Sequence, residues 1–188
     1  MNNIYDAASN FVKLLDVEYK ILLGKKGNVV ELDICFDKSH FFHLAGLQYL
    51  KDIHDLDNQR EYIFDRILSK KITAEKIESS MFYSKIQRRV HFLAMLESIF
   101  DSNDTIFKYD ATKNILTSKI AADFLMKTNL ELTNIFTFLD KRRDNKYYCR
   151  SFFPQDFKDY SYRQRQWTIL SKIKIIQSTK TEITLYKR

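Results

Sequence analysis

His40 and His43 are the first residues of this 188-residue chain whose types and spacing could do chemistry. They lie three positions apart, so on a helix both side chains share one face. Such a pair can ligate a metal ion, or one imidazole can act as a general acid or base near neutral pH. Lys51 and Asp52 follow instead of a third ligand in the same register. We therefore expect no metal, which leaves acid–base chemistry or a histidine satisfied by backbone and solvent.

A second set of candidates lies near the C-terminus. The pattern of residues 146–153 predicts a strand that ends at Pro154. Side chains of a strand point alternately to its two faces, so Tyr148, Arg150 and Phe152 are expected on one face. A guanidinium on such a face has the donor geometry that binds a phosphate.

The next long strand, expected at 167–176, carries Thr168 and Lys172 on one face. If this face meets the preceding one, Arg150 or Ser151 would surround a phosphate together with Thr168 and Lys172. The chain contains no nucleophile elbow, catalytic-cysteine pattern or dinucleotide fingerprint. Common hydrolase and dehydrogenase functions therefore lose support.

The elements that must position these side chains follow from the hydrophobic pattern. Helical spacing predicts four helices: about 5–16, 38–54, 73–100, and one that begins at Asn58 with Glu61 as its capping partner. Gly46 falls inside the second helix, which fits a place where another element packs closely.

Alternation of period two predicts the strands. It indicates a β-hairpin over 19–36, with Gly24 and Gly27 in its loop, and later strands at 105–109, 121–127, 132–139, 146–153, 167–176 and 182–187. The polar segment 155–166 is expected to be a loop or a short helix. This order predicts an α+β fold: an N-terminal helix and β-hairpin, central helices, and a C-terminal antiparallel β-sheet of about four to six strands.

The positive charge of the chain is concentrated in its last 48 residues. Residues 141–188 hold 13 Lys and Arg against 4 Asp and Glu, a net charge of +9, whereas the first 140 residues have a net charge of −2. Aromatic residues are interleaved with these cations. Cations neutralise phosphates and flat rings stack on unpaired bases, so we expect RNA to bind here. The alternative is a solvated basic face over an aromatic core.

Composition sets further bounds. The chain is 45% hydrophobic, which is enough for a sizeable core, and no apolar run reaches the roughly 18 residues of a membrane span. The start of the chain lacks the pattern of a secretory signal, so we expect a cytoplasmic protein with no membrane contact. Cys35 and Cys149 are expected to be reduced thiols, and no cofactor is indicated.

Several short segments together resemble a known family. They are His40 to Leu47, Ile120 to Leu125, Ser151 to Pro154, Tyr160, Gln164, and Thr168 to Leu170. Their order and spacing are similar to the fourth phage-associated family of barnase, EndoU, colicin and RelE-like (BECR) nucleases. The resemblance implies a single domain, 1–188, with a four-stranded antiparallel sheet after N-terminal helices. In this domain 58–100 would be a helical insertion or cover, and 105–188 the basic β-rich part.

The resemblance also implies a chemistry. Metal-independent RNA cleavage uses the 2′-hydroxyl as nucleophile, and it needs a base, an acid and donors for the charge on phosphate. The expected catalytic residues are His43 as acid or base, Arg150 and Lys172 as phosphate stabilisers, and Thr168. The expected substrate contacts are Ser151, Tyr160 by stacking or proton donation, His40 and Gln164.

Three functions remain open. The first is a ribonuclease or toxin-like effector of a phage or mobile element. The second is a catalytically inactive RNA- or DNA-binding member of the same fold. The third is a protein-binding inhibitor of a host defence or nucleoprotein target. RNA is the expected partner, and a protein partner or antitoxin is a further possibility.

Overall fold

A computed structural model describes residues 1–102, 105–113 and 118–188. The chain forms two compact units. We call residues 1–15 and 37–97 the helical unit, and residues 16–36 and 98–188 the sheet unit. No helix in the described ranges is long and apolar enough to cross a membrane.

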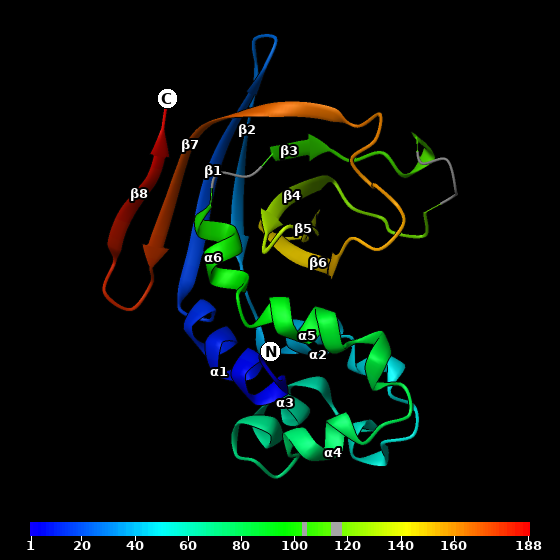
Figure 1. Cartoon of the computed structure of the whole chain (residues 1–188). Helices are drawn as coiled ribbons and strands as arrows, with labels where there is room; N and C mark the ends of the chain where they lie inside the picture. Colours follow the sequence, from blue (N-terminus) through cyan, green and yellow to red (C-terminus); the bar gives the residue numbers. More distant parts are fainter. Residues whose placement is uncertain (103–104, 114–117) are drawn as a thin grey trace. The chain divides into compact units, whose positions relative to one another are not determined.

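The helical unit is built from short helices (Figure 1). They are α1 (Ile4–Leu14), α2 (Lys38–Ala45), α3 (Arg60–Leu68), α4 (Ala74–Glu78) and α5 (Gln87–Leu93), with 3₁₀ turns η1 (Leu47–Tyr49), η2 (His54–Leu56) and η3 (Tyr83–Lys85). A further helix, α6 (Leu96–Asp101), begins in this unit and ends in the sheet unit.

The N-terminal helix shows how this unit holds together. Asn3 and Asp6 form a capping box that fixes the start of α1. The buried face of α1 carries Phe11, whose ring lies edge-on to Phe41 of α2 at 5.5 Å and to Phe64 of α3 at 5.9 Å. These three buried rings form the centre of the helical core, and each comes from a different helix.

Two of the predicted helices are wrong in extent. The helix expected over 38–54 ends at Ala45, because Gly46 adopts a left-handed backbone with φ of 80°. A methyl group at Gly46 would come within 2.9 Å of Ile86 Cγ2, so the expected close packing is confirmed. The helix expected over 73–100 is broken into α4, η3, α5 and α6. Ser80 and the backbone of Met81 bond Asp52 at this break, outside any helix.

The predicted capping box at Asn58 is also wrong. Helix α3 begins at Arg60, and its N-cap position is Gln59, which makes no side-chain cap. Helix α2, by contrast, has Asp37 as its N-cap, with His40 as the reciprocal partner.

The sheet unit contains eight described strands, more than the four to six expected. They are β1 (Val17–Lys25), β2 (Asn28–Cys35), β3 (Thr105–Lys108), β4 (Phe124–Leu130), β5 (Thr133–Lys141), β6 (Tyr147–Pro154), β7 (Arg165–Ile176) and β8 (Thr181–Lys187), with a 3₁₀ turn η4 at Ala111–Lys113. The β-hairpin and the C-terminal strands were predicted to within a few residues.

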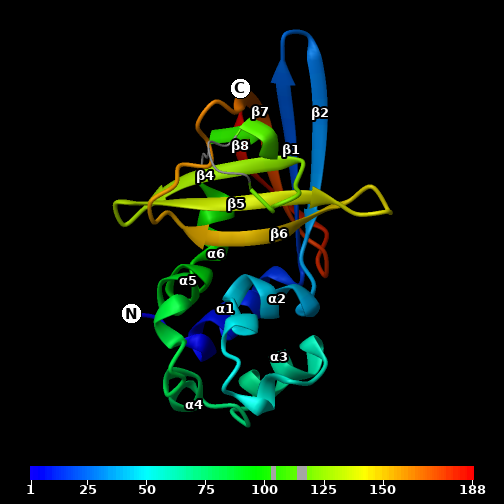
Figure 2. The ribbon, with the colours of Figure 1, turned by 90° about the vertical axis from the view of Figure 1, so that its right-hand side faces the viewer.

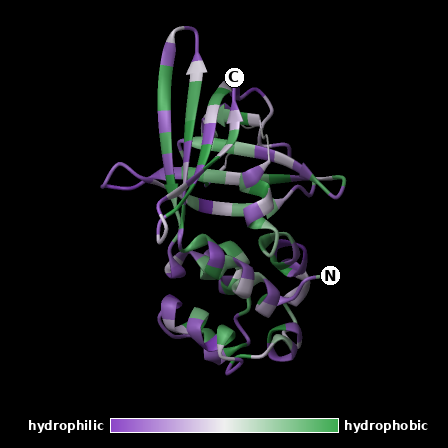
Figure 3. Cartoon of the chain, turned by 90° about the vertical axis from the view of Figure 1, so that its left-hand side faces the viewer, coloured by the Kyte–Doolittle hydropathy of each residue, from purple (hydrophilic) through white to green (hydrophobic). Residues whose placement is uncertain are grey.

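These strands form one sheet in the order β1-β2-β6-β5-β4-β3-β7-β8. β1 also pairs with β7, so the sheet closes into a ring with β8 attached at the side. The prediction of a purely antiparallel sheet is wrong at one place, because β2 and β6 pair in parallel through Ile34 and Tyr147. Figure 2 shows β4, β5 and β6 side by side and the β1–β2 hairpin extending away from them. Figure 3 shows hydrophobic and hydrophilic residues alternating along this hairpin.

A β-bulge in β6 changes which side chains share a face. Phe138 of β5 pairs with Ser151 and Leu139 pairs with Cys149, so Arg150 is an extra residue. Beyond it the alternation reverses, and Phe152 joins Cys149 on the inner side of the ring. The expectation that Arg150 and Phe152 share a face is therefore wrong.

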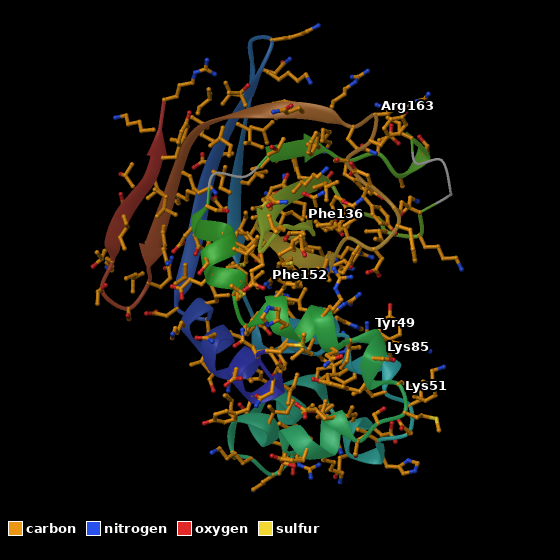
Figure 4. The ribbon with its side chains drawn as sticks, viewed as in Figure 1. Tyr49, Lys51, Lys85, Phe136, Phe152 and Arg163 are labelled. Carbon is orange, nitrogen blue, oxygen red and sulfur yellow. The ribbon has the colours of Figure 1, made fainter. Side chains whose placement is uncertain are left out.

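The outer side of β4 and β5 carries a second core. Tyr109, Leu125, Phe136 and Phe138 are buried there, and Phe153 and Tyr160 pack against them. Residues 155–164 form a loop with turns over this cluster, as predicted. Figure 4 labels Phe136 of this outer cluster and Phe152 of the inner side.

Candidate functional site

One end of the sheet unit gathers charged side chains from four strands. β3 and β5 end there, and β4 and β6 begin there. We call Lys108, Asp123, Asp140, Tyr148 and Arg150 the rim cluster. Its members lie in or next to four consecutive strands, β3 to β6, and the pairing of these strands brings them to one end of the sheet.

Arg150 is the best placed of the predicted phosphate-binding residues. Its Nη1 donates to Asp140 Oδ2 at 2.6 Å and to Tyr148 Oη at 3.1 Å. The bulge in β6 supplies the extra residue that lets this side chain meet Asp140 on the neighbouring strand. The Arg150 side chain remains 44% exposed, so its other N–H groups can reach a ligand.

A second carboxylate, Asp123, lies just before β4. Its backbone N–H donates to Leu139 O of β5 at 2.9 Å, and Leu139 is also the residue that Phe124 pairs with. Lys108 Nζ binds Asp123 Oδ1 at 2.8 Å, and Arg150 binds Asp140. Burial, and then the charges of Asp123 and Asp140, raise the pKa of nearby Tyr147. Asp123, Asp140 and Tyr148 were not among the predicted site residues, although Tyr148 was expected on the same face as Arg150.

The β5–β6 turn adds positive charge beside the rim cluster, in which two cations are balanced by two carboxylates. Arg142 and Arg143 in this turn and Lys141 at the end of β5 are exposed, and Arg142 Nε lies 3.6 Å from Asp144 Oδ2. The sheet unit as a whole has 20 Lys and Arg against 14 Asp and Glu, a net charge of +6. Such a surface attracts polyanions.

Ser151 and Thr168 lie on strands that are not neighbours. Ser151 follows Arg150 in β6 and is half-buried opposite Phe138. Thr168 is exposed on β7 opposite Gly24 of β1. β5, β4 and β3 separate β6 from β7 in the sheet order, so strand pairing does not bring these two hydroxyls together.

Lys172 is fully buried on the inner side of the ring. Its Nζ donates to the carbonyl oxygens of Phe100, at 3.0 Å, and Ser102. These carbonyls belong to the end of α6, where a cation satisfies unpaired acceptors and the helix dipole. This contact gives Lys172 a structural role, and we leave it out of the substrate contacts proposed below.

Gln164 and Tyr160 also make structural contacts. The Gln164 side chain accepts a hydrogen bond from Asp110 N at 2.8 Å and donates one to Asp110 O at 3.0 Å. These are the two bonds that the backbone of a neighbouring strand would make with Asp110. The Tyr160 ring lies 5.5 Å from those of Phe136 and Phe138. Lys158 Nζ lies 4.7 Å from the centre of the Tyr160 ring, which is half-buried.

Both candidate histidines belong to the helical unit. His40 Nδ1 accepts the backbone N–H of Asp37 at 3.1 Å, so one of its nitrogens serves the α2 cap. His43 is half-buried one turn later. Burial, and then the Arg60 charge, lower the pKa of His43, while a hydrogen bond with Gln48 opposes them. A neutral imidazole near neutral pH can accept a proton.

Across residues 1–102, 105–113 and 118–188, no three His, Cys, Asp or Glu side chains come together in a group that could hold a metal ion. Cys35 and Cys149 are free thiols, as expected.

Comparison with known proteins places the chain in a family. No curated protein and no solved structure matches it. One family model does match, over residues 3–188, and it is described as phage-Barnase-EndoU-ColicinE5/D-RelE like nuclease 4. The match covers nearly the whole chain, including both the helical unit and the sheet unit. The chain therefore belongs to this family of phage-associated BECR nucleases.

Proposed function

We propose that this protein is a metal-independent ribonuclease of phage or mobile-element origin, acting as a toxin-like effector in the cytoplasm. Membership of a nuclease family supports this proposal in general terms. The observation that carries it furthest is Arg150, a half-exposed guanidinium fixed by Asp140 and Tyr148 beside a basic turn.

The geometry of Arg150 suits the charge that develops during phosphate cleavage. A guanidinium held by a carboxylate and a phenol is preorganised, so it needs no rearrangement when negative charge builds up on phosphate. Lys141 at the end of β5 and Arg143 in the adjoining turn can contact the flanking phosphates. Ser151, the next residue along β6, stays in the proposal as a hydrogen-bond donor to phosphate.

The proposed reaction is a transesterification. The 2′-oxygen attacks phosphorus, the bond between phosphorus and the 5′-oxygen breaks, and a 2′,3′-cyclic phosphate and a 5′-hydroxyl end form. A base removes the 2′-hydroxyl proton, and an acid donates a proton to the leaving oxygen. His43 is kept as a separate candidate for the base, because its lowered pKa favours the neutral form.

The test is cleavage of labelled tRNA and mRNA by the purified protein in EDTA. Arg150→Lys keeps the charge but loses the planar fork, so we expect at least about a tenfold loss of cleavage. His43→Ala is expected to lose at least about tenfold as well, with folding checked by circular dichroism. Arg188→Lys makes the same change at an exposed position that the proposal does not use, and it is the matched control.

The outcome also identifies the reaction. A 2′-deoxy nucleotide at the cleaved position must block cleavage if the 2′-hydroxyl is the nucleophile. Cleavage that persists there, or that disappears in EDTA, would contradict the proposed mechanism. Full activity of Arg150→Lys would remove Arg150 from the site.

A catalytically inactive nucleic-acid-binding protein is the second candidate. The contacts of Lys172, Gln164 and Tyr160 favour it, because these predicted site residues instead stabilise the fold. Salt-sensitive RNA binding without cleavage would support this candidate over the first.

A further inference from the structure

The helical unit carries an exposed basic and aromatic surface of its own. We call Tyr49, Lys51, Phe82, Lys85 and Arg89 the helical patch. Figure 4 shows Tyr49, Lys51 and Lys85 as neighbours on the surface of this unit. Tyr49 is 45% exposed, and Lys51 and Lys85 are exposed as well.

Two chain segments that are distant in sequence build this patch. Asp52 accepts hydrogen bonds from Ser80 Oγ at 2.6 Å and from Met81 N at 2.9 Å. These bonds hold residues 49–52 against residues 80–82. The left-handed Gly46 completes the junction, because a methyl group there would meet Ile86 Cγ2, Arg89 Cδ and Tyr49 Cδ2 within 3.4 Å. The patch is therefore a defined surface.

Each ring of the patch has a cation beside it. The guanidinium of Arg89 lies 5.6 Å from the centre of the Tyr49 ring, and Lys85 Nζ lies 4.8 Å from that of Phe82. In the described part of the chain, neither Lys51 nor Lys85 has an acidic partner.

Charge is concentrated at this patch. Residues 49–52 and 81–89 contain four Lys and Arg and one Asp. The rest of the helical unit contains seven Lys and Arg and nine Asp and Glu, so it is net acidic. A polyanion that approaches the helical unit is therefore attracted to the patch and repelled elsewhere.

We propose that the helical patch binds single-stranded RNA. The exposed Tyr49 ring offers a face for an unpaired base, and Lys51 and Lys85 bind the phosphates on either side. Single strands fit this chemistry because their bases are free to stack, whereas the bases of a duplex are already stacked on each other. The proposal rests on the proposed function in that RNA is the substrate, and it adds a binding site outside the sheet unit.

The test measures binding by the full chain without cleavage. The probe is a fluorescein-labelled 2′-O-methyl oligouridine, which has no 2′-hydroxyl to attack phosphorus. We expect Lys51→Gln/Lys85→Gln to weaken binding at least about fivefold. The slope of log K against log salt should fall by about 1.4, which corresponds to the loss of two phosphate contacts with a single strand. Lys13→Gln/Lys71→Gln removes the same charge from exposed positions elsewhere on the helical unit and is the control.

Stacking is tested separately. We expect Tyr49→Leu to weaken binding about tenfold and Tyr49→Phe to restore it, because the ring face provides the contact. All these positions are exposed, and thermal unfolding verifies that each variant is folded.

The results separate this proposal from the ribonuclease. Binding that depends on the patch, without any cleavage of natural RNA, would support the patch and contradict the ribonuclease. Cleavage together with equal binding by the patch and control variants would overturn the patch alone. Failure of the wild type to bind the oligouridine would overturn it, as would stronger competition by polyglutamate than by oligouridine.

Discussion

Gly46 and Gly27 have nearly the same backbone conformation, with φ of 80° and 82°, but different surroundings. Gly46 is buried against Ile86, whereas nothing lies within 4 Å of a methyl group at Gly27. We expect Gly27→Ala to lower the free energy of unfolding by about 1 kcal/mol, the cost of a left-handed alanine. Gly46→Ala should lose about 1–3 kcal/mol more through crowding. Urea denaturation measures both variants, and equal losses would show that the Ile86 contact contributes nothing.

The lowered pKa of His43 predicts a pH-dependent stability. Between the folded pKa and the ordinary imidazole value of 6.5, the unfolded chain binds more protons at this position. The His43 contribution is therefore fully present above about pH 6.5 and is lost as the pH falls through the folded pKa. We expect the wild type to lose more stability than His43→Gln between about pH 7.5 and about pH 5.5. Parallel losses in urea titrations of the two proteins would rule this out.

Lys172 shows that residue type and face alone do not separate a site residue from a structural one. A lysine on one face of an alternating strand has the charge expected of a phosphate-binding residue. The ammonium of Lys172, however, binds carbonyl oxygens at the end of α6. Lys172→Met leaves two carbonyls without this donor, so we expect a loss of about 1–3 kcal/mol in the free energy of unfolding. Lys180→Met, in an exposed turn, is expected to change it by less than about 0.5 kcal/mol. A Lys172→Met protein that is fully stable but inactive in RNA cleavage would return Lys172 to the site.

At the scale of elements, the strands were predictable and the helices less so. Alternating residues such as Ile21, Leu23, Leu32 and Ile34 report a buried face directly, so the hairpin was located from sequence. Helix ends depend on partners elsewhere in the chain, such as Asp52, which bonds Ser80 and Met81 where the long helix was expected. The bulge at Arg150 is set by the register of β5, which the sequence of β6 does not reveal.

The loop over the outer cluster yields a prediction at the element scale. Tyr160 packs against Phe136, Phe138 and Phe153, and Lys127 Nζ binds Asp159 at 3.0 Å beside it. Tyr160→Ala should therefore loosen residues 155–164 and lower the free energy of unfolding by about 2 kcal/mol, whereas Tyr160→Phe should keep the packing. Hydrogen exchange follows the loop and urea denaturation the whole chain. If Tyr160→Ala weakens RNA binding without changing either, Tyr160 contacts RNA as originally predicted.

Over the whole molecule, short segments spread along the chain pointed to the family, which a match over residues 3–188 shows, and the order of helical and alternating patterns indicated the α+β class. Closure of the ring could not be predicted from the sequence, because it joins β1 to β7 across about 150 residues and leaves no local pattern. The concentration of charge near the C-terminus was correct, but it concealed the helical patch. The four cations of residues 49–52 and 81–89 are offset by acidic residues elsewhere in the same unit.

The distribution of charge leads to a prediction for the whole molecule. The β5–β6 turn presents exposed cations beside Arg150, whereas Lys180 and Lys187 lie in or next to β8. We expect Lys141→Gln/Arg143→Gln to reduce the salt slope of oligouridine binding by about 1.4, because two phosphate contacts are lost. Lys180→Gln/Lys187→Gln removes the same charge from positions outside the proposed site. This variant should therefore leave the salt slope nearly unchanged. Anisotropy titrations between about 50 and 200 mM salt measure both. Equal reductions would mean that RNA responds to net charge alone, and the basic turn would then lose its place in the proposed site.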